Sequence, residues 1–349
     1  MYRLQGTIKY IIPILLLLCC CIGQAQQPIG INKVSLGIPD SSSYSYYVSA
    51  HFYGGNQNVS GYPASTILGN VDLLNAASNS FTICSGDLFK DIRGQWKLYD
   101  TTFFNKLTKP LFNAVGNHDV TDDLFETHYG PTSYYFQIGK DIHVVLNTEA
   151  DDGSIKGEQL KMLKKAMSIS GVSNILIYSH RPIWAEATKE FDDIFKGNTV
   201  STFGINFNSE VAPLLESLNK DINLYWFSGS LGGGAVASFF YHEKDNLHYI
   251  QSAIRDLKRD ALLQVKSNNG NISFETVSLT GETLKELESY NLDAWRDKHP
   301  VKEFNYRLVP FYIKSMLTHR FFWYGIIYMF LGVIFILFIK KIRNRRKRV

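Results

Sequence analysis

Apolar and polar positions follow two different periods along the chain. Short apolar runs, typical of buried strands, alternate with stretches whose apolar positions recur every three or four residues, as on one face of a helix. Strands are predicted at Ser45–Phe52, Phe81–Ser85, Pro110–Val115, Tyr134–Gly139, Ile142–Asn147, Asn174–Ser179, Asn223–Ser228, Leu247–Ala253, Ala261–Ser267 and Ile272–Leu279. Helices are predicted at Ser65–Ser78, Gly157–Met167, Ser209–Leu218 and Gly281–Trp295. This order predicts one α/β layered domain with a mixed sheet over residues 44–280.

The N-terminus has the pattern of a signal peptide over residues 1–25. Arg3 and Lys9 form a basic start, an apolar run follows, and small residues precede a predicted cleavage site at Ala25. Residues 26–43 are a polar lead-in. Two alternatives stay open: an uncleaved N-terminal anchor, and a lipoprotein that uses one of three adjacent cysteines, although none of these follows a small residue.

The C-terminus has the pattern of a membrane span. A helical juxtamembrane segment is predicted over 281–320, and the uncharged run Phe321–Ile339 is long enough to cross a bilayer. Residues 340–349 carry seven Lys or Arg and should stay in the cytoplasm. The sequence therefore predicts a single-pass protein of the cytoplasmic membrane with its globular part outside the cytoplasm. A sorting signal that is removed by processing is the alternative.

The charge distribution argues against nucleic acid as a partner. The formal net charge is +4, but the C-terminal tail contributes +7 and Arg3 with Lys9 contributes +2, which leaves −5 for residues 26–339. A nucleic-acid-binding domain needs a basic face on its folded part. Of the four cysteines, only Cys84 lies outside the signal peptide, so the mature chain has no internal disulfide and Cys84 is expected to be an inert core residue.

Side chains able to bind a metal follow several predicted strands. His51 lies at the end of the first, Asp87 follows the second, Asn117 and His118 the third, and His180 the strand at 174–179. In α/β folds, sites form at the carboxyl ends of strands. Imidazole, carboxylate and amide groups gathered there would build a metal site on rigid elements.

The blocks that carry these residues, "GDLF", "GNHD" and "YSHRP", resemble in order and spacing the calcineurin-like metallophosphoesterase superfamily. The resemblance covers about residues 44–271 and is nearest to the cyclic-nucleotide phosphodiesterase and purple acid phosphatase branches. It implies a four-layer α/β sandwich with two bridged metal ions that promote phosphoester hydrolysis. By position, Asp87 would bridge the ions, His51 would bind the first, and Asn117 and His180 the second. His118 would donate a proton to the leaving oxygen.

The chain departs from that family pattern at three ligand positions. The first block, Asp-x-His, is Ser49-Ala50-His51 here, and the fifth, Gly-His-x-His, is "GSLG" with Ser230 and Gly232 in place of the two imidazoles. The remaining ligands predict one divalent ion (Mn, Fe or Zn) rather than two, or none. Lys90 stands where the family often has an acidic residue that orients the histidine, so the orientation of His118 stays open.

Three functions are compatible with this sequence. One is an extracytoplasmic phosphoesterase with a reduced metal site, acting on a small phosphoester. The second is an inactive relative of such enzymes that binds a ligand or a protein partner through the old cleft. The third is a structural member of an envelope assembly. Whether the chain is an enzyme therefore stays open, and no residue identifies a substrate.

Overall fold

The protein is described here from a computed structural model. The described residues are 31–36, 41–186, 188–191, 194, 204–232, 234–298, 309, 313, 316–317 and 320–346. The predicted signal peptide, half of the lead-in, most of residues 299–319 of the predicted juxtamembrane segment, and residues 347–349 of the basic tail lie outside them.

The first sheet carries the strands that precede the "GDLF" and "GNHD" blocks. Its order is β11-β10-β1-β2-β3. Strands β1, β2 and β3 are parallel. Strand β10 is antiparallel to β1, and the edge strand β11 is antiparallel to β10. Their bounds are β1 Ser43–Ser49, β2 Phe81–Cys84, β3 Leu111–Asn113, β10 Ala261–Asn268 and β11 Asn271–Ser278.

The second sheet carries the strand that precedes "YSHRP". Its order is β4-β5-β6-β7-β9-β8. Strands β5, β6, β7 and β9 are parallel, while β4 and β8 are antiparallel edge strands. Their bounds are β4 Tyr134–Ile138, β5 Asp141–Val145, β6 Asn174–Ser179, β7 Asn223–Ser228, β8 Phe239–Lys244 and β9 Leu247–Ser252.

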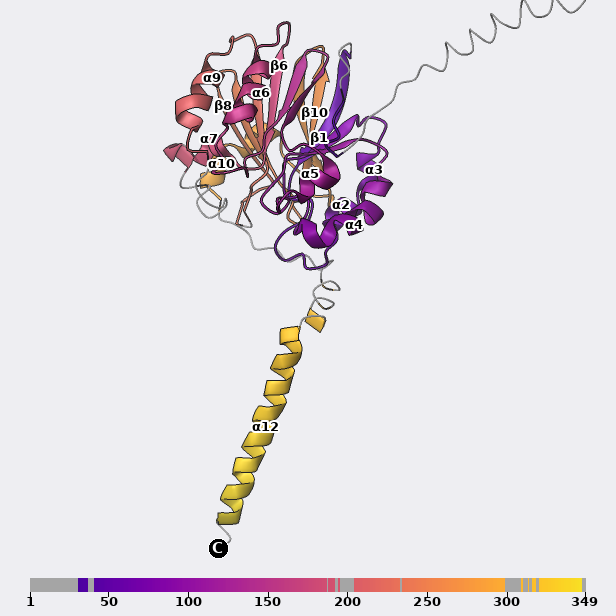
Figure 1. Ribbon diagram of the computed structural model, residues 1–349, viewed down its shortest axis with the longest axis vertical. Helices are drawn as coiled ribbons and strands as arrows, with labels where there is room; N and C mark the ends of the chain where they lie inside the picture. The colour runs from indigo at the N-terminus through magenta and orange to yellow at the C-terminus, as the bar shows by residue number, and fades with distance from the viewer. Residues whose placement is uncertain are drawn as a thin grey trace, which may run out of the picture.

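The two sheets face each other and each is covered by helices, which gives four layers (Figure 1). Because successive strand residues point to opposite faces, each sheet contributes to two apolar cores. One core fills the space between the sheets. The first sheet also packs on α2 Ser65–Leu68, α3 Val71–Leu74, α4 Ile92–Thr102 and α5 Leu124–Tyr129. The second also packs on α6 Gly157–Met167, α7 Ile183–Glu186, α9 Ala212–Glu216 and α10 Leu292–Arg296. The predicted four-layer α/β class is thus confirmed.

Several predicted helices are shorter than their apolar patterns. The stretch 65–78 is two helices, α2 and α3, because the side-chain amide of Asn70 bonds the carbonyls of Thr66 and Leu279 between them. The stretch 209–218 begins with a π-helical turn, Phe207–Val211, before α9. Only the end of 281–295 is helical, as a 3₁₀ turn at Leu287–Tyr290 followed by α10.

Other elements were not predicted or end early. Helices α4 and α5 and the edge strand β8 were not predicted, although apolar residues recur at helical spacing in α4, at Ile92, Trp96 and Tyr99. Strand β1 ends at Ser49, three residues before the predicted end, because His51 adopts a left-handed backbone with φ of 57°. The chain after β11 also packs on the folded body, since the indole of Trp295 donates to the carbonyl of Phe239 at 2.9 Å.

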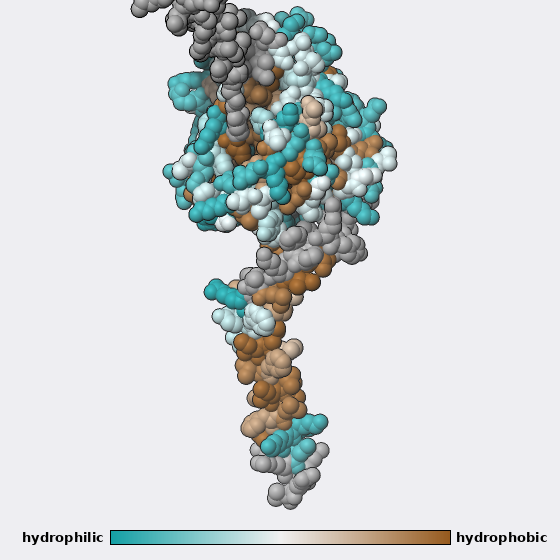
Figure 2. Space-filling model, turned by 90° about the vertical axis from the view of Figure 1, so that its right-hand side faces the viewer, coloured by the Kyte–Doolittle hydropathy of each residue, from teal (hydrophilic) through white to brown (hydrophobic). Residues whose placement is uncertain are grey.

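The predicted apolar C-terminal helix is present as α12, Arg320–Arg346. By length and composition, Arg320–Asn344 could span a membrane, with a mean hydropathy of 2.4 and none of that window buried. Figure 2 shows it as an apolar band that ends in hydrophilic residues, whereas the folded body has a mixed surface. The helix itself does not indicate on which side of a membrane the folded body lies.

Candidate metal centre

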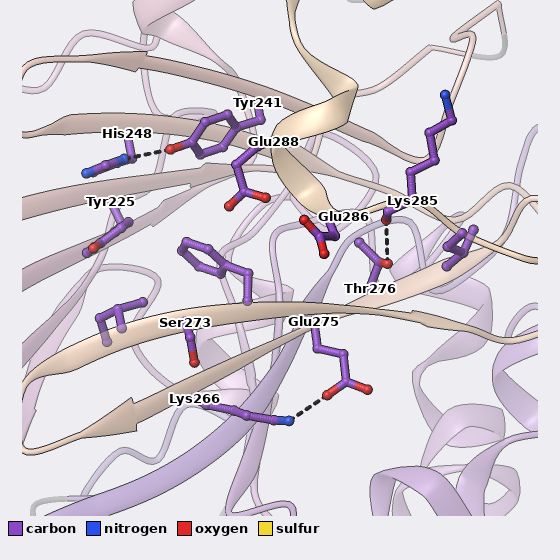
Figure 3. Close-up of a pocket in the computed structure, with 13 residues that line it drawn as sticks. Tyr225, Tyr241, His248, Lys266, Ser273, Glu275, Thr276, Lys285, Glu286 and Glu288 are labelled. Atoms are coloured by element: carbon purple, nitrogen blue, oxygen red, sulfur yellow. Dashed lines mark hydrogen bonds and ion pairs between the residues drawn. The ribbon is translucent and has the colours of Figure 1, made fainter.

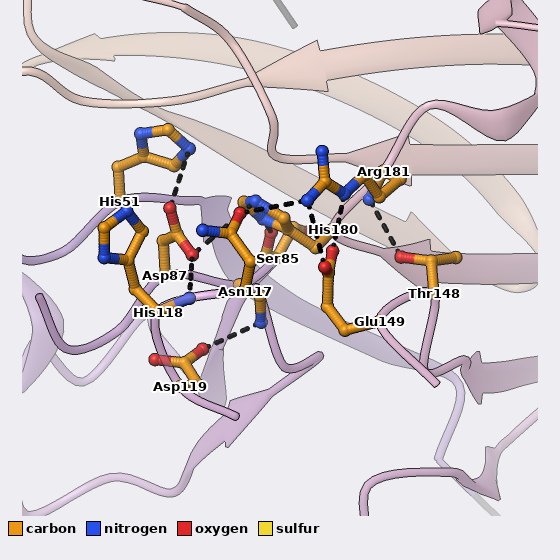
Figure 4. A network of polar contacts seen from close by, with 12 residues as sticks. His51, Ser85, Asp87, Asn117, His118, Asp119, Thr148, Glu149, His180 and Arg181 are labelled. Carbon is orange, nitrogen blue, oxygen red and sulfur yellow. Dashed lines mark hydrogen bonds and ion pairs between the residues drawn. The ribbon is translucent and has the colours of Figure 1, made fainter. Parts of the chain in front are cut away.

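Three predicted ligands from both sheets meet at one point. His51 follows β1, Asp87 follows β2 and His180 follows β6, and one ligand atom from each lies within 4.8 Å of the other two. The Nε2 atoms of His51 and His180 each lie 3.6 Å from a different oxygen of Asp87 (Figure 4). All three side chains are buried. The residues expected to serve two ions thus form a single cluster with the carboxylate between the imidazoles.

The backbone around this cluster is held in uncommon conformations. His51 and Asp87 both have a φ of 57°, in the left-handed region that few residues other than glycine adopt. A Cβ on Gly116 would lie 2.3 Å from Oδ1 of Asp87, so only glycine allows the "GNHD" loop to approach the carboxylate. Such strain is held where the surrounding structure fixes it, and it is frequent at functional sites.

Each imidazole presents a nitrogen that is free to bind a cation. Nδ1 of His180 donates to the carbonyl of Ser85 at 3.0 Å, which leaves a lone pair on Nε2 facing Asp87. Neither ring nitrogen of the buried His51 has a hydrogen-bond partner. Orphaned buried nitrogens are costly, and a metal ion would satisfy them. Two histidines and a carboxylate suit a divalent transition metal and leave coordination positions open.

Burial also sets the charge state of the cluster. It lowers the pKa of His51 well below its usual value and lowers the pKa of His180, so both rings favour the neutral form that binds metal. Burial raises the pKa of Asp87, although the positive charges of His118, Arg255 and Arg181 oppose that rise. A bound cation would favour the ionised carboxylate for the same reason that those charges do.

His118 lies beside the cluster with one nitrogen already engaged. Its backbone amide donates to Oδ1 of Asp87 at 3.2 Å, and its Nδ1 donates to the carbonyl of Lys90 at 2.7 Å. Its ring packs against Tyr53, with centroids 5.2 Å apart. The sequence left open what orients His118, because Lys90 stands where an acidic residue was expected. In the structure the backbone carbonyl of Lys90 orients the ring, and no acidic side chain is needed.

Asp119, the last residue of "GNHD", fastens the loop. One carboxylate oxygen accepts from the amide of Phe89 at 2.9 Å, and the other accepts from the amide of Gly116 at 2.9 Å and from Asn113 at 3.0 Å. Burial, with the charge of Asp87, nevertheless raises the pKa of Asp119 to about 6. This buried carboxylate joins the two loops that carry Asp87 and His118.

Asn117 is exposed and its oxygen is engaged elsewhere. That oxygen accepts from Nη2 of Arg181 at 3.2 Å. Arg181 also makes a two-point ion pair with Glu149, with distances of 2.8 and 3.0 Å. Figure 4 shows this group beside the His-Asp-His cluster. Metal binding by Asn117 stays a prediction.

Three positions lack the metal ligand that the family pattern has there, namely Ser49, Ser230 and Gly232. The structure around them is closely packed. The hydroxyl of Ser49 is fully buried and accepts from Ser252 at 3.2 Å. The amide of Ser230 donates to the carbonyl of His180 at 2.9 Å. A Cβ on Gly229 would lie 1.9 Å from the carbonyl oxygen of Ser85, so the loops of the two sheets touch there through backbone alone.

The structure is similar to that of a dimetal phosphatase from Danio rerio, with a TM-score of 0.48 and 10% identity over 68% of this chain and 96% of that one. It is similar to a purple acid phosphatase from yellow lupin seeds (TM-score 0.48, 11% identity, 71% and 54% coverage) and to PhoD (0.46, 9%, 74% and 74%). The likeness is one of fold.

These likenesses do not extend to activity. At identities of 9–11% and TM-scores below 0.5, the likeness concerns the arrangement of the chain and not its activity. No protein-family model matches the chain. No curated protein matches it in sequence. The resemblance to the calcineurin-like metallophosphoesterases therefore rests on the motif order, the four layers and the meeting of the motif side chains.

A cavity of about 650 Å³ lies away from this cluster (Figure 3). It opens between the sheets at β8, β9, β10 and β11, toward the ends opposite the motif loops. Tyr225 and His248 stack on its wall with centroids 4.6 Å apart, and Lys266 pairs with Glu275 at its rim. None of the predicted site residues lines it, so the sequence motifs and the cavity belong to different parts of the fold.

Glu149 and Tyr53 belong to the site but were not singled out from the sequence. Glu149, which pairs with Arg181, lies in a loop after β5 with no recognisable motif. Tyr53, which lies between the rings of His51 and His118, follows the first motif by two residues. One signal could have pointed to Glu149. Arg181 of "YSHRP" was expected in the wall of the site, and a buried arginine is usually paired with a carboxylate.

Proposed function

We propose that this chain is a membrane-anchored phosphoester hydrolase that uses one divalent metal ion. The observation that carries the proposal is the meeting of His51, Asp87 and His180, with free Nε2 atoms on both imidazoles. Three ligands with open positions are the usual arrangement of a hydrolytic metal. The missing ligands at Ser49, Ser230 and Gly232 favour one ion over two.

The residues present can take distinct parts in hydrolysis. A divalent ion at the cluster would act as a Lewis acid toward a phosphoryl group and activate water. Asp87 would bind the same ion between the imidazoles of His51 and His180. His118, with Nδ1 bonded to the Lys90 carbonyl, has Nε2 available to donate a proton to the leaving oxygen. Asp119 would keep that ring in place by fastening its loop.

The charge at the C-terminal end supports a site outside the cytoplasm. The basic residues at the end of α12 and beyond it favour a cytoplasmic C-terminus, and the folded body would then lie on the other side of the membrane. The substrate class is then a small phosphoester that reaches the outer face of the cytoplasmic membrane. No protein partner is required by this proposal.

The test is the metal content of the full chain, purified in detergent and equilibrated in turn with manganese, iron and zinc. We expect about one equivalent by elemental mass spectrometry, and its loss in Asp87→Asn. The control is Asp122→Asn, because Asp122 is exposed and removing its charge leaves the cluster intact. Hydrolysis of an aryl phosphate should be lost with the metal. Equal metal content in the wild type and Asp87→Asn would refute the proposal.

A binding module without catalysis is the second candidate. The engagement of the Asn117 oxygen by Arg181 and the packed serine pair at Ser49 and Ser252 favour it, because both positions are satisfied without an ion. This candidate predicts that the wild type binds no metal and that Asp87→Asn alters only stability. The metal measurement therefore separates the two.

A further inference from the structure

A buried arginine with no acidic partner lies beside the candidate metal centre. Arg255 follows β9, is 8% exposed, and its Nε has no hydrogen-bond partner. Among the described residues, no carboxylate forms an ion pair with it. An isolated charge in a protein interior is costly unless an opposite charge compensates it.

The backbone of this segment is fixed so that the side chain can face the cluster. The amide of Ile254 donates to the carbonyl of Ala50 at 3.1 Å, next to His51. The amide of Arg255 donates to Asp260 at 2.9 Å, and its carbonyl accepts from Gln57 at 2.5 Å. The arginine thus belongs to the first-sheet side of the cluster, where the family pattern would have held its first metal ion.

The neighbours of the guanidinium are the cluster residues themselves. It interacts with the hydroxyl of Tyr53, whose ring stacks on His51 at 5.7 Å between centroids. The charge of Arg255 opposes protonation of His51 and favours the ionised form of Asp87. Arg259 adds further positive charge and lowers the pKa of Arg255, an effect second to that of burial. The local field therefore favours an anion.

Arg181 cannot supply this function. Its guanidinium is held by both oxygens of Glu149 and by the oxygen of Asn117. That ion pair neutralises its charge and occupies its donors. Arg255 differs because the carboxylate whose charge acts on its guanidinium is Asp87, which the two imidazoles already flank.

We propose that Arg255 binds the phosphate group of the ligand, with its guanidinium in place of the second metal ion. The inference rests on the proposed function, which places a phosphate group at this cluster. A planar guanidinium with free donors suits two phosphate oxygens, and its fixed charge replaces part of the charge that a second cation would have provided. One metal ion and one arginine would then divide the oxygens of the group between them.

The test is binding of inorganic phosphate to the full chain in detergent, by calorimetry, with and without saturating manganese. We expect Arg255→Gln to weaken phosphate binding by about tenfold or more, as the loss of a charge-assisted contact does. Arg255→Lys keeps the positive charge but cannot donate to two phosphate oxygens as a planar guanidinium does, so it should bind phosphate with intermediate affinity. Lys258→Gln removes one charge from the same loop at an exposed position and should bind as the wild type does.

Metal content keeps the two proposals separate. Arg255→Gln should retain the metal equivalent of the wild type, because Arg255 is not a ligand, and a melting curve reports whether the variant is folded. Displacement of phosphate by phenyl phosphate would identify an ester as the ligand, whereas its failure would identify the free ion, and either result supports a phosphate site. Phosphate binding that is absent from the wild type, or unchanged in both Arg255 variants, would overturn the inference even if metal binding is normal.

Discussion

Gly229 is the position at which a single methyl group should do the most damage. It lies after β7, and a Cβ there would meet the carbonyl oxygen of Ser85 at 1.9 Å and the Cβ of Ala50 at 2.4 Å. The first of these atoms is backbone, so no rotamer change can relieve the contact. Overpacking of this kind usually costs 1–3 kcal/mol, and a rigid partner puts Gly229→Ala at about 3 kcal/mol or more. For a folded body of this size, that corresponds to a fall in melting temperature of roughly 6–12 °C.

The same substitution should weaken the metal centre. The Ser85 carbonyl also accepts from Nδ1 of His180, so displacing it would turn that ring, and disturbing such a partner typically lowers metal affinity by about 10–100-fold. The assay is a thermal melt by circular dichroism together with a manganese titration of the full chain. Gly94→Ala is the control, because its Cβ would contact nothing within 4 Å inside α4 and should stabilise the helix slightly. A Gly229→Ala melt within a degree of the wild type, with unchanged metal affinity, would refute the reasoning.

Three further predictions follow from other parts of the structure. Burial raises the pKa of Asp260 from 3.8 to about 6, so the wild type should lose about 2.5 kcal/mol of unfolding free energy from this group as pH rises from 4 to 7. Asp260→Asn should remove that dependence, as urea unfolding at each pH would show. If the unfolding free energy of the variant changed with pH as much as that of the wild type, the prediction would be wrong. Trp295→Ala should cost about 3–5 kcal/mol by the same method, because the indole is buried and bonded to Phe239; a neutral result would mean that α10 is not part of the folded body. Deleting residues 320–349 should release the chain from membranes on fractionation, and retention would show another anchor.

The strand ends could be predicted from the sequence because short apolar runs and the polar residues after them are local features. His51, Asp87 and His180 each follow such a run, and the parallel strands bring them to the same end of the two sheets. The family resemblance also implied a shared site with Asp87 between the two histidines. The distances within the cluster could not be predicted, because the spacing of two facing sheets depends on how both pack. Arg255 was missed for the same reason, since its loop carries no motif and meets the site only through the contact of Ile254 with Ala50.

The helices were predicted less well for a different reason. Apolar spacing over 65–78 continues through Gly69, and the break depends on an Asn70 amide that bonds Leu279 more than two hundred residues away. The left-handed turn at His51 likewise ends β1 without any local signal, because histidine seldom adopts that conformation. Local patterns thus predicted which segments are regular, and long-range hydrogen bonds decided where those segments end.

The buried hydroxyl pair of Ser49 and Ser252 opposes an added metal ligand at the end of β1. A carboxylate in place of Ser49 would enter a fully buried position on the strand next to the one that leads to Asp87, where burial raises the cost of ionising it. It would also break the hydrogen bond that now joins the ends of β1 and β9. Imidazoles in place of Ser230 or Gly232 would lack that carboxylate as a co-ligand. A second metal site therefore cannot be added by one substitution, and the first change toward it would lower the free energy of unfolding.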